Sequence, residues 1–328
     1  RSYGAKYATY YGPITGSGKI SHTDGGYVTF KDMTGFSGEF VNERGSVTFD
    51  SAIHFSNLTS NSSNDKSLIT LTGKAGSSVT GTIKLAANSS LTMDIGKENT
   101  LETTNFLVSG TAAQTITLTS GTLKVTGTNN ARKQSDLSFS LNTAGTGSNT
   151  TTLHIAANAA IDAADTVLAT GWEGNSTINL EGGTINVKGL CSSNPTNAVA
   201  INLKSGTVKL GDYGITDYKW SVTGNQTDAK VSLTLGTVEI IAQADLSIDP
   251  HRLDDNATDI VTLTDAVTGT TFNTNNHTIM VNDCLVGDGK VVKTGAGTLI
   301  LQKAGTYAGG TVINAGTLRA SHASALGA

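Results

Sequence analysis

The stretch "GAGTLILQKAGTYAGGTVINAGTLRA", residues 295–320, contains the step Gly-Thr-Leu twice, at 297–299 and at 316–318. Related steps return throughout the chain, and in each of them a Gly precedes Thr or Ser and a short alternating run. The further copies are RGSVTF at 44–49, TGTIKL at 80–85, SGTLKV at 120–125, GGTINV at 182–187, SGTVKL at 205–210 and LGTVEI at 235–240. Most spacings between these glycines lie near multiples of about 20 residues, the short end of solenoid repeat lengths.

Apolar and polar residues alternate within each copy, as in Ile83/Leu85 and Leu299/Leu301. An alternation with a period of two predicts a strand with one buried face. One such strand buries too little apolar surface to offset its ordering entropy, so the copies must stack on one another. Gly tolerates positive φ at the corners between strands, and the Thr hydroxyls are expected to stack along the outside.

The predicted fold is therefore all-β: a right-handed parallel β-helix, or β-solenoid, of roughly 14–16 rungs with a few loop insertions. We expect residues 1–328 to form a single domain with few helical segments, and we interpret the alanine-rich stretch 158–169 as strand and turn. The alternative is an array of β-sandwiches, which would show turns every 8–12 residues but not one repeated step.

The composition and the motifs of the chain argue against several classes of function. The formal net charge is −4 and only 15% of residues are charged, which argues against binding nucleic acid or an anionic membrane. No run of about 18 apolar residues is present, so we expect no transmembrane helix. The six histidines have no metal-ligand spacing, and TGSGKIS at 15–21 lacks a Gly that a phosphate loop requires. We therefore expect no cofactor, no metal site and no catalytic residues.

The two cysteines, Cys191 and Cys284, are separated by about four rungs of a solenoid with this repeat length. Four rungs correspond to roughly 19 Å along the axis, whereas a disulfide requires Cα atoms within about 7 Å. We predict two thiols that pack as small apolar residues.

Three stretches do not follow the repeat: 129–136, 211–220 and 245–259. Insertions in solenoids form loops on one face and often serve binding, although each stretch is also compatible with a solvated loop. The second stretch is the best binding candidate because it contains Tyr213, Tyr218 and Trp220 in a chain poor in aromatics. The third is rich in Asp, but it lacks the spacing of known calcium loops, so a calcium site there is the weaker interpretation.

The third residue after each repeat glycine should point outward. Stacking would then align Lys84, Lys124, Lys209 and Arg319 in a mostly basic lane along the shaft. Such a lane could contact an anionic polysaccharide or a neighbouring molecule. It could also serve only solubility, because Lys on an outer strand face discourages stray strand pairing.

Residues 287–327 resemble the passenger-associated repeat of bacterial autotransporters. The resemblance covers three short motifs and the ending Ala325-Leu326-Gly327. These motifs are Lys293-x-Gly295-x-Gly297-Thr298-Leu299, Thr306-Tyr307-x-Gly309-Gly310-Thr311 and Asn314-Ala315-Gly316-Thr317-Leu318. The remainder of the chain resembles the family in style, and the adhesin branch that includes antigen 43 and the adhesin involved in diffuse adherence fits best.

This resemblance implies a passenger domain of a Gram-negative bacterium, exported through a C-terminal membrane barrel that the chain does not include, and either displayed on the cell surface or secreted. It implies an adhesin rather than an enzyme, acting by multivalent non-covalent contacts in attachment, self-association or biofilm formation. The expected partners are host extracellular matrix proteins, glycosaminoglycans, or the same protein on neighbouring cells. The alternatives are a β-helical polysaccharide lyase or hydrolase, and a secreted toxin passenger.

Overall fold

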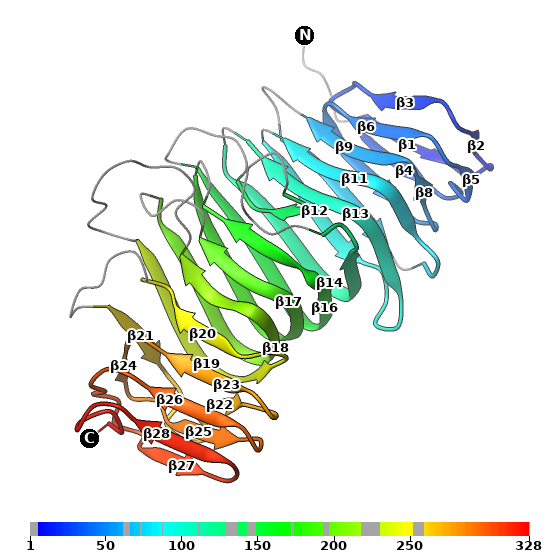
Figure 1. Cartoon of the computed structure of the whole chain (residues 1–328). Helices are drawn as coiled ribbons and strands as arrows, with labels where there is room; N and C mark the ends of the chain where they lie inside the picture. Colours follow the sequence, from blue (N-terminus) through cyan, green and yellow to red (C-terminus); the bar gives the residue numbers. More distant parts are fainter. Residues whose placement is uncertain are drawn as a thin grey trace.

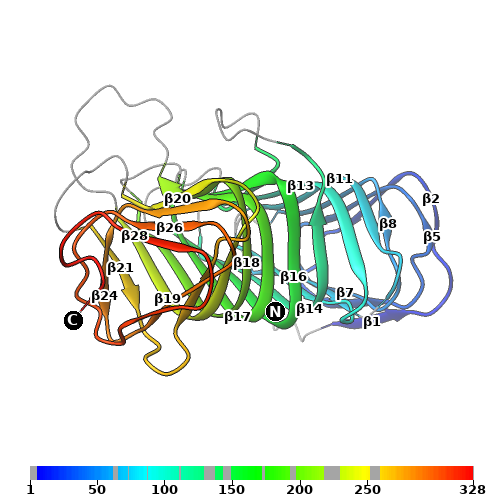
Figure 2. The ribbon, with the colours of Figure 1, turned by 60° about the horizontal axis from the view of Figure 1, so that its bottom comes forward.

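The structure, a computed structural model, describes residues 6–61, 66–72, 74–86, 88–110, 112–128, 137–142, 149–171, 174–192, 197–217, 230–251 and 259–327. These residues form strands and turns and contain no helix. Consequently, none of the described segments forms a helix that could span a membrane. The strands build an elongated tube with the first strands, such as β2 (Thr15–Gly16) and β5 (Gly35–Phe36), at one end and the last strands, such as β26 (Thr298–Leu301) and β28 (Thr317–Ala320), at the other (Figures 1 and 2).

Each strand of the tube pairs in parallel with a strand one turn later in the chain. The pairings follow three faces, which we name A, B and C in the order in which the chain passes them. Face A contains β1 (Tyr7–Tyr10), β4 (Tyr27–Phe30), β7 (Gly45–Phe49), β10 (Ser67–Thr72), β12 (Ser89–Asp94), β14 (Gln114–Val125), β16 (Thr150–Thr170), β17 (Asn175–Ser192), β18 (Val199–Asp217), β19 (Val231–Ala242), β21 (Ile260–Leu263) and β24 (Cys284–Gly287).

Face B begins at β8 (His54–Phe55) and ends with β22 (Thr270–Asn273), β25 (Val291–Thr294) and β27 (Thr311–Ile313). Face C contains β3 (Lys19–His22), β6 (Glu39–Asn42), β9 (Asn57–Asn61), β11 (Ser78–Ala86), β13 (Thr100–Ser109), β15 (Phe139–Ser140), β20 (Leu246–Asp249), β23 (Thr278–Val281), β26 (Thr298–Leu301) and β28 (Thr317–Ala320). The long strands β11, β13, β14, β16, β17, β18 and β19 bend at the corners and contribute to more than one face. A separate pair, β2 (Thr15–Gly16) and β5 (Gly35–Phe36), lies at the N-terminal end.

The core fills the inside of the tube because every second side chain of a strand points inward. On face A the inward residues pair from rung to rung, and each is at most 3% exposed. The column runs through Ile69, Leu91, Ile116, Leu153, Ile178, Ile201, Leu233, Val261 and Leu285. One continuous apolar cluster extends from Phe30 to Ala325. The all-β architecture with long parallel strands thus agrees with the predicted solenoid.

Glycine serves this coil in two ways, of which only one was expected. Gly316 has φ +73°, a backbone conformation that other residues rarely adopt, and it lies at the corner before β28. Gly297 has no positive φ, but a Cβ added there would lie 1.9 Å from the carbonyl oxygen of His277 in the preceding rung. The second glycine is therefore required by the close approach of two rungs rather than by a turn.

The described residues contain fewer rungs than predicted. Within them, twelve successive pairings on face C join thirteen strands or strand segments, compared with the 14–16 rungs expected. Ile20 pairs with Phe40 after 20 residues (40 − 20), but Phe106 pairs with Phe139 after 33 (139 − 106). Insertions between strands lengthen the central rungs, so the same chain completes fewer turns.

Two of the predicted interruptions are partly regular strand. Residues 211–217 belong to β18 and residues 246–249 form β20, so neither segment is the loop that the sequence suggested. The interpretation of 158–169 as strand is confirmed, because this segment lies within β16. The stretch 129–136, together with 218–220 and 252–258, falls outside the described residues.

Neither cysteine forms a disulfide, as predicted. Cys191 is buried in β17, where Val167 and Tyr213 pack around it. Cys284 begins β24 and is partly buried, and this burial raises the pKa of its thiol.

Candidate binding surface

Outward side chains form columns because neighbouring rungs pair in register about 4.8 Å apart. The predicted basic lane is not one of these columns, and this prediction is wrong. Lys84 lies on face C, between Thr59 and Leu107 of the adjacent rungs. Lys124 and Lys209 share a column on face B. Arg319 belongs to another column of face C, beside Ile300. The Gly-Thr step recurs on different faces, so its third residues do not align.

The column that does contain Lys124 and Lys209 is mixed in charge. It passes from Glu102 to Lys124, Asp162, Asn186 and Lys209. The Lys124 ammonium donates to Glu102 at 2.9 Å, and this hydrogen bond and the Glu102 charge raise the pKa of Lys124. Asn186 donates to Asp162 at 2.7 Å. Lys124 is thus paired with a carboxylate of an adjacent rung, and Asp162 shares the column, so the column offers no continuous attraction to a polyanion.

Tyr213 is not an exposed anchor. It lies in β18, is half-buried, and packs against Val167 and Cys191. The Lys188 ammonium sits 5.0 Å from the centre of its ring, a cation–π contact. Tyr218 and Trp220, which were predicted to join it, lie outside the described residues.

The Asp-rich stretch contributes buried groups rather than a metal site. Asp249 and Asp259 are both less than 10% exposed, and Lys303 lies 3.5 Å from Asp259. Among the residues that the structure describes, no group of three or more His, Cys, Asp or Glu side chains could hold a metal ion. Asp245 is exposed and accepts a hydrogen bond from the Thr278 amide at 2.7 Å. Asp254 and Asp255 lie outside the described residues.

His251, from the same stretch, is buried between two acceptors. Its Nδ1 lies 2.7 Å from Asp283 Oδ2, and its Nε2 lies 2.8 Å from the Val231 carbonyl oxygen. Burial alone lowers the pKa of His251, but the hydrogen bond and charge of Asp283, the Val231 carbonyl and the charge of Asp259 raise it overall. Because a neutral imidazole has only one N–H, the pair of acceptors favours the charged ring, in agreement with the raised pKa.

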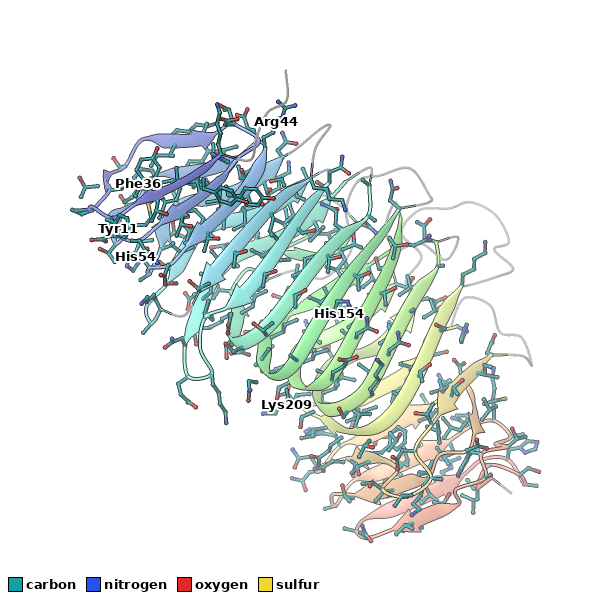
Figure 3. All side chains as sticks on the ribbon, turned by 180° about the vertical axis from the view of Figure 1, so that it is seen from behind. Tyr11, Phe36, Arg44, His54, His154 and Lys209 are labelled. Atoms are coloured by element: carbon teal, nitrogen blue, oxygen red, sulfur yellow. The ribbon has the colours of Figure 1, made fainter. Side chains whose placement is uncertain are left out.

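A different surface emerges from the register of face A, and we name it the hydroxyl–amide strip. It consists of two adjacent outward columns that contain no Asp, Glu, Lys or Arg. His154 belongs to the first column, and Figure 3 shows it midway along the shaft. The first column is Thr9, Thr29, Thr48, Thr70, Thr92, Thr117, His154, Asn179, Asn202, Thr234, Thr262 and Val286. The second is Tyr7, Tyr27, Ser46, Leu68, Ser90, Thr115, Thr152, Thr177, Ala200 and Ser232.

Sequence reasoning missed this strip because it followed the Thr residues that come after Gly. Those threonines are divided among faces: Thr184 stacks on Thr207 on face B, whereas Thr298 stacks on Thr317 on face C. The signal for the strip was Thr as the outward residue of the first strand in each rung, as in "SVTF" at 46–49 and "SLTMD" at 90–94.

The terminal repeat is tied together by a buried lysine. Lys293, in β25, is 0% exposed. Its ammonium donates to the carbonyl oxygens of Thr294 and Gly295, each at 2.7 Å, and of Ala315 at 2.9 Å. Burial lowers the pKa of this ammonium. The lysine thereby connects the corner after β25 to the corner before β28, one rung further on.

Tyr307 fills the end of the core in the same region. Its side chain is completely buried, and its hydroxyl lies 2.5 Å from the Thr311 hydroxyl. A Cβ on Gly305 or Gly327 would come within 2.8 or 3.0 Å of the Tyr307 ring. The Lys, Tyr and Gly positions of the terminal motifs therefore have structural roles in this chain.

Comparison with known proteins supports one assignment. The family described as passenger-associated-transport-repeat matches residues 291–320, the segment that contains Lys293, Tyr307 and Gly316. No curated protein and no solved structure matches the chain. The match supports an autotransporter passenger domain and therefore a protein that is secreted or displayed at the cell surface.

Proposed function

We propose that the chain is a right-handed β-helical passenger that acts as an adhesin, holding a cell to a surface or to its neighbours by many weak contacts along the shaft. The terminal repeat supports export to the cell exterior. The observation that carries adhesion is the hydroxyl–amide strip, which presents the same kind of polar group on successive rungs. Contacts that are individually weak become strong when many of them form together.

The proposed contacts are non-covalent, and no reaction is part of the proposal. The best-defined charged dyad, His251 with Asp283, is buried with side chains 9% and 1% exposed, so it supports a structural role. Incubation of the chain with polysaccharides is expected to produce neither reducing ends nor unsaturated uronides. Either product would favour a lyase or hydrolase over an adhesin.

Adhesion itself can be tested with beads coated with the purified chain. Coated beads are expected to clump or to stay on surfaces coated with host matrix protein or glycan, whereas beads coated with an unrelated protein wash away. If the coated beads neither clump nor attach to any of these surfaces, the adhesin proposal is wrong.

Replacing Lys84, Lys124 and Lys209 together by Glu is expected to leave bead adhesion within about twofold of wild type, because these lysines do not form one lane. The measurement is the fraction of beads retained under flow. Exposed Lys66, Lys74 and Lys97 replaced by Glu give a matched control with an equal change in net charge. If beads coated with the first variant are lost under flow while beads coated with the control are retained, then Lys84, Lys124 and Lys209 do belong to the contact surface.

A further inference from the structure

We infer that the hydroxyl–amide strip binds an uncharged polysaccharide that lies along the solenoid axis. This inference rests on the adhesin proposal and names its ligand class. The two columns contain no Asp, Glu, Lys or Arg from Thr9 to Val286. A charged chain would find no opposite charge there to compensate its desolvation, and the net charge of −4 opposes polyanions.

The outward column next to Thr9–Val286 carries charges, and two cation–carboxylate pairs in it link adjacent rungs. Lys31 lies 2.5 Å from Asp50, and Lys204 lies 2.6 Å from Glu181. The hydrogen bond from Lys204 and its charge lower the pKa of Glu181, which keeps this pair ionised and mutually satisfied. These four charges beside the strip are thus paired across rungs.

The hydroxyls of the strip are available to a ligand. In the described part of the chain, the side chains of Thr29, Thr70, Thr92, Thr117 and Thr234 have no hydrogen-bond partner, whereas corner residues such as Thr103 donate to backbone carbonyls. Each hydroxyl can donate one hydrogen bond and accept others, which is also the capacity of a sugar hydroxyl.

The amide part of the strip continues this pattern. Asn202 donates to Asn179 at 2.9 Å, and Asn179 approaches His154 at 3.4 Å. A side-chain amide has two N–H donors, so each Asn retains one after its contact with the next rung. At the N-terminal end, the exposed rings of Tyr7 and Tyr27 stack with centroids 4.9 Å apart and add apolar surface of the kind that sugar C–H groups contact.

The strip is preorganised for a linear ligand. Thr is stiff at χ1, and parallel pairing on both sides fixes each rung, so binding orders few protein groups. The groups repeat every 4.8 Å or so along the axis. A hexose residue in an extended chain advances by a similar distance, so successive sugars meet equivalent positions.

The dimensions favour such a chain over a second protein. Two columns separated by two residues span about 7 Å, and twelve rungs span about 50 Å. The resulting area of about 350 Å² is well below the roughly 800 Å² that each partner contributes to a stable protein interface. A single polysaccharide chain has the width that this strip can cover.

The test compares two variants with the same chemistry on different faces. Variant A replaces Thr92, Thr117, Thr152 and Thr177 of the strip by Val, which removes hydroxyls but keeps the β-branched shape. Variant B makes the same change at Thr100, Thr122, Thr184 and Thr207, the outward threonines of face B. Affinity electrophoresis in gels containing β-1,3-glucan, galactomannan, hydroxyethyl cellulose or heparin measures binding by the native chain and both variants.

The wild type is expected to be retarded by at least one of the three neutral polysaccharides and not by heparin. Variant A should bind that polysaccharide at least tenfold more weakly, and variant B should bind it like the wild type. Equal binding by the two variants, preferential retardation by heparin, or no retardation by any neutral probe would overturn the inference. A wild-type dimer in analytical ultracentrifugation that variant A abolishes would also overturn it, in favour of a second copy.

Bead adhesion separates this inference from the function on which it rests. If beads coated with variant A still clump and attach like the wild type, the adhesin proposal stands and the strip is not its contact surface. If wild-type beads fail to adhere although the chain binds the neutral polysaccharide, the adhesin proposal is wrong. The inference that the strip binds this polysaccharide then still stands.

Discussion

Replacing Lys293 by Met is expected to release the last two rungs of the solenoid. The substitution removes the only donor that the described residues provide to the Gly295 and Ala315 carbonyl oxygens. Hydrogen bonds to charged groups contribute about 1.5–3 kcal/mol each, so we expect the terminal rungs to lose about 2–4 kcal/mol of local stability. Hydrogen exchange over 291–320 should accelerate roughly 30-fold or more, while β16–β18 remain protected.

Lys290→Met is the matched control for this variant. Lys290 lies three residues earlier, and its ammonium donates to the Val267 carbonyl at 2.6 Å from an exposed position. Water can replace an exposed contact of this kind, so exchange over 291–320 should change little. Equal exchange rates in the two variants would show that the buried ammonium does not hold the terminal rungs.

The inward half of the structure could be predicted from sequence because burial imposes a simple alternation. Ile83/Leu85 and Leu299/Leu301 alternate with polar residues, and all four are buried as expected. The repeated glycine predicted corners with positive φ, as at Gly316, whereas Gly297 serves a close approach between rungs that was not predicted. Period and composition therefore defined the class of fold.

The outward half could not be predicted because it depends on which face each strand occupies. Lys84 and Lys124 follow identical Gly-Thr steps, yet they lie on faces C and B. The difference arises from the variable lengths between strands, which shift a motif from one corner to another. Tyr213 was misplaced for a related reason: a strand that turns a corner can bury an aromatic that composition alone assigns to a loop.

The burial of Lys293 was also not predicted, because a lysine is almost never fully buried. Its burial follows from β25 lying under the last corner of the chain, where Gly316 leaves space for the ammonium 2.7 Å from where a Cβ would be. The Lys and Gly of the terminal motif are therefore coupled: a side chain at 316 would collide with the ammonium that satisfies the corner carbonyls.

The stability of the C-terminal half is expected to fall as pH rises through the pKa of His251. The folded state raises this pKa above that of the unfolded chain, about 6.5. The contribution of the charged ring is therefore complete below pH 6.5 or so and is lost as pH increases through the folded-state pKa. Over that window, one proton changes stability by at most about 1.4 kcal/mol per pH unit.

The physical cause is the pair of acceptors on either side of the ring. When His251 loses a proton, either Asp283 or the Val231 carbonyl loses its donor inside the protein. The other described charged groups nearby are Asp259 and Lys303, 3.5 Å apart, and the Cys284 thiol adjoins them. The contacts connect β19, the end of β20 and the turn before β24, so deprotonation weakens the attachment of three consecutive rungs.

The measurement is the urea midpoint from pH 5.5 to 9, followed by far-ultraviolet circular dichroism. His251→Gln cannot titrate and should give a flatter profile than the wild type, with the largest difference in stability at the acidic end. His54→Gln is the control, because His54 is half-exposed and its ring contacts the Ser78 hydroxyl instead of a carboxylate. Parallel pH profiles for the wild type and His251→Gln would mean that the ring is not held in its charged form by Asp283 and Val231.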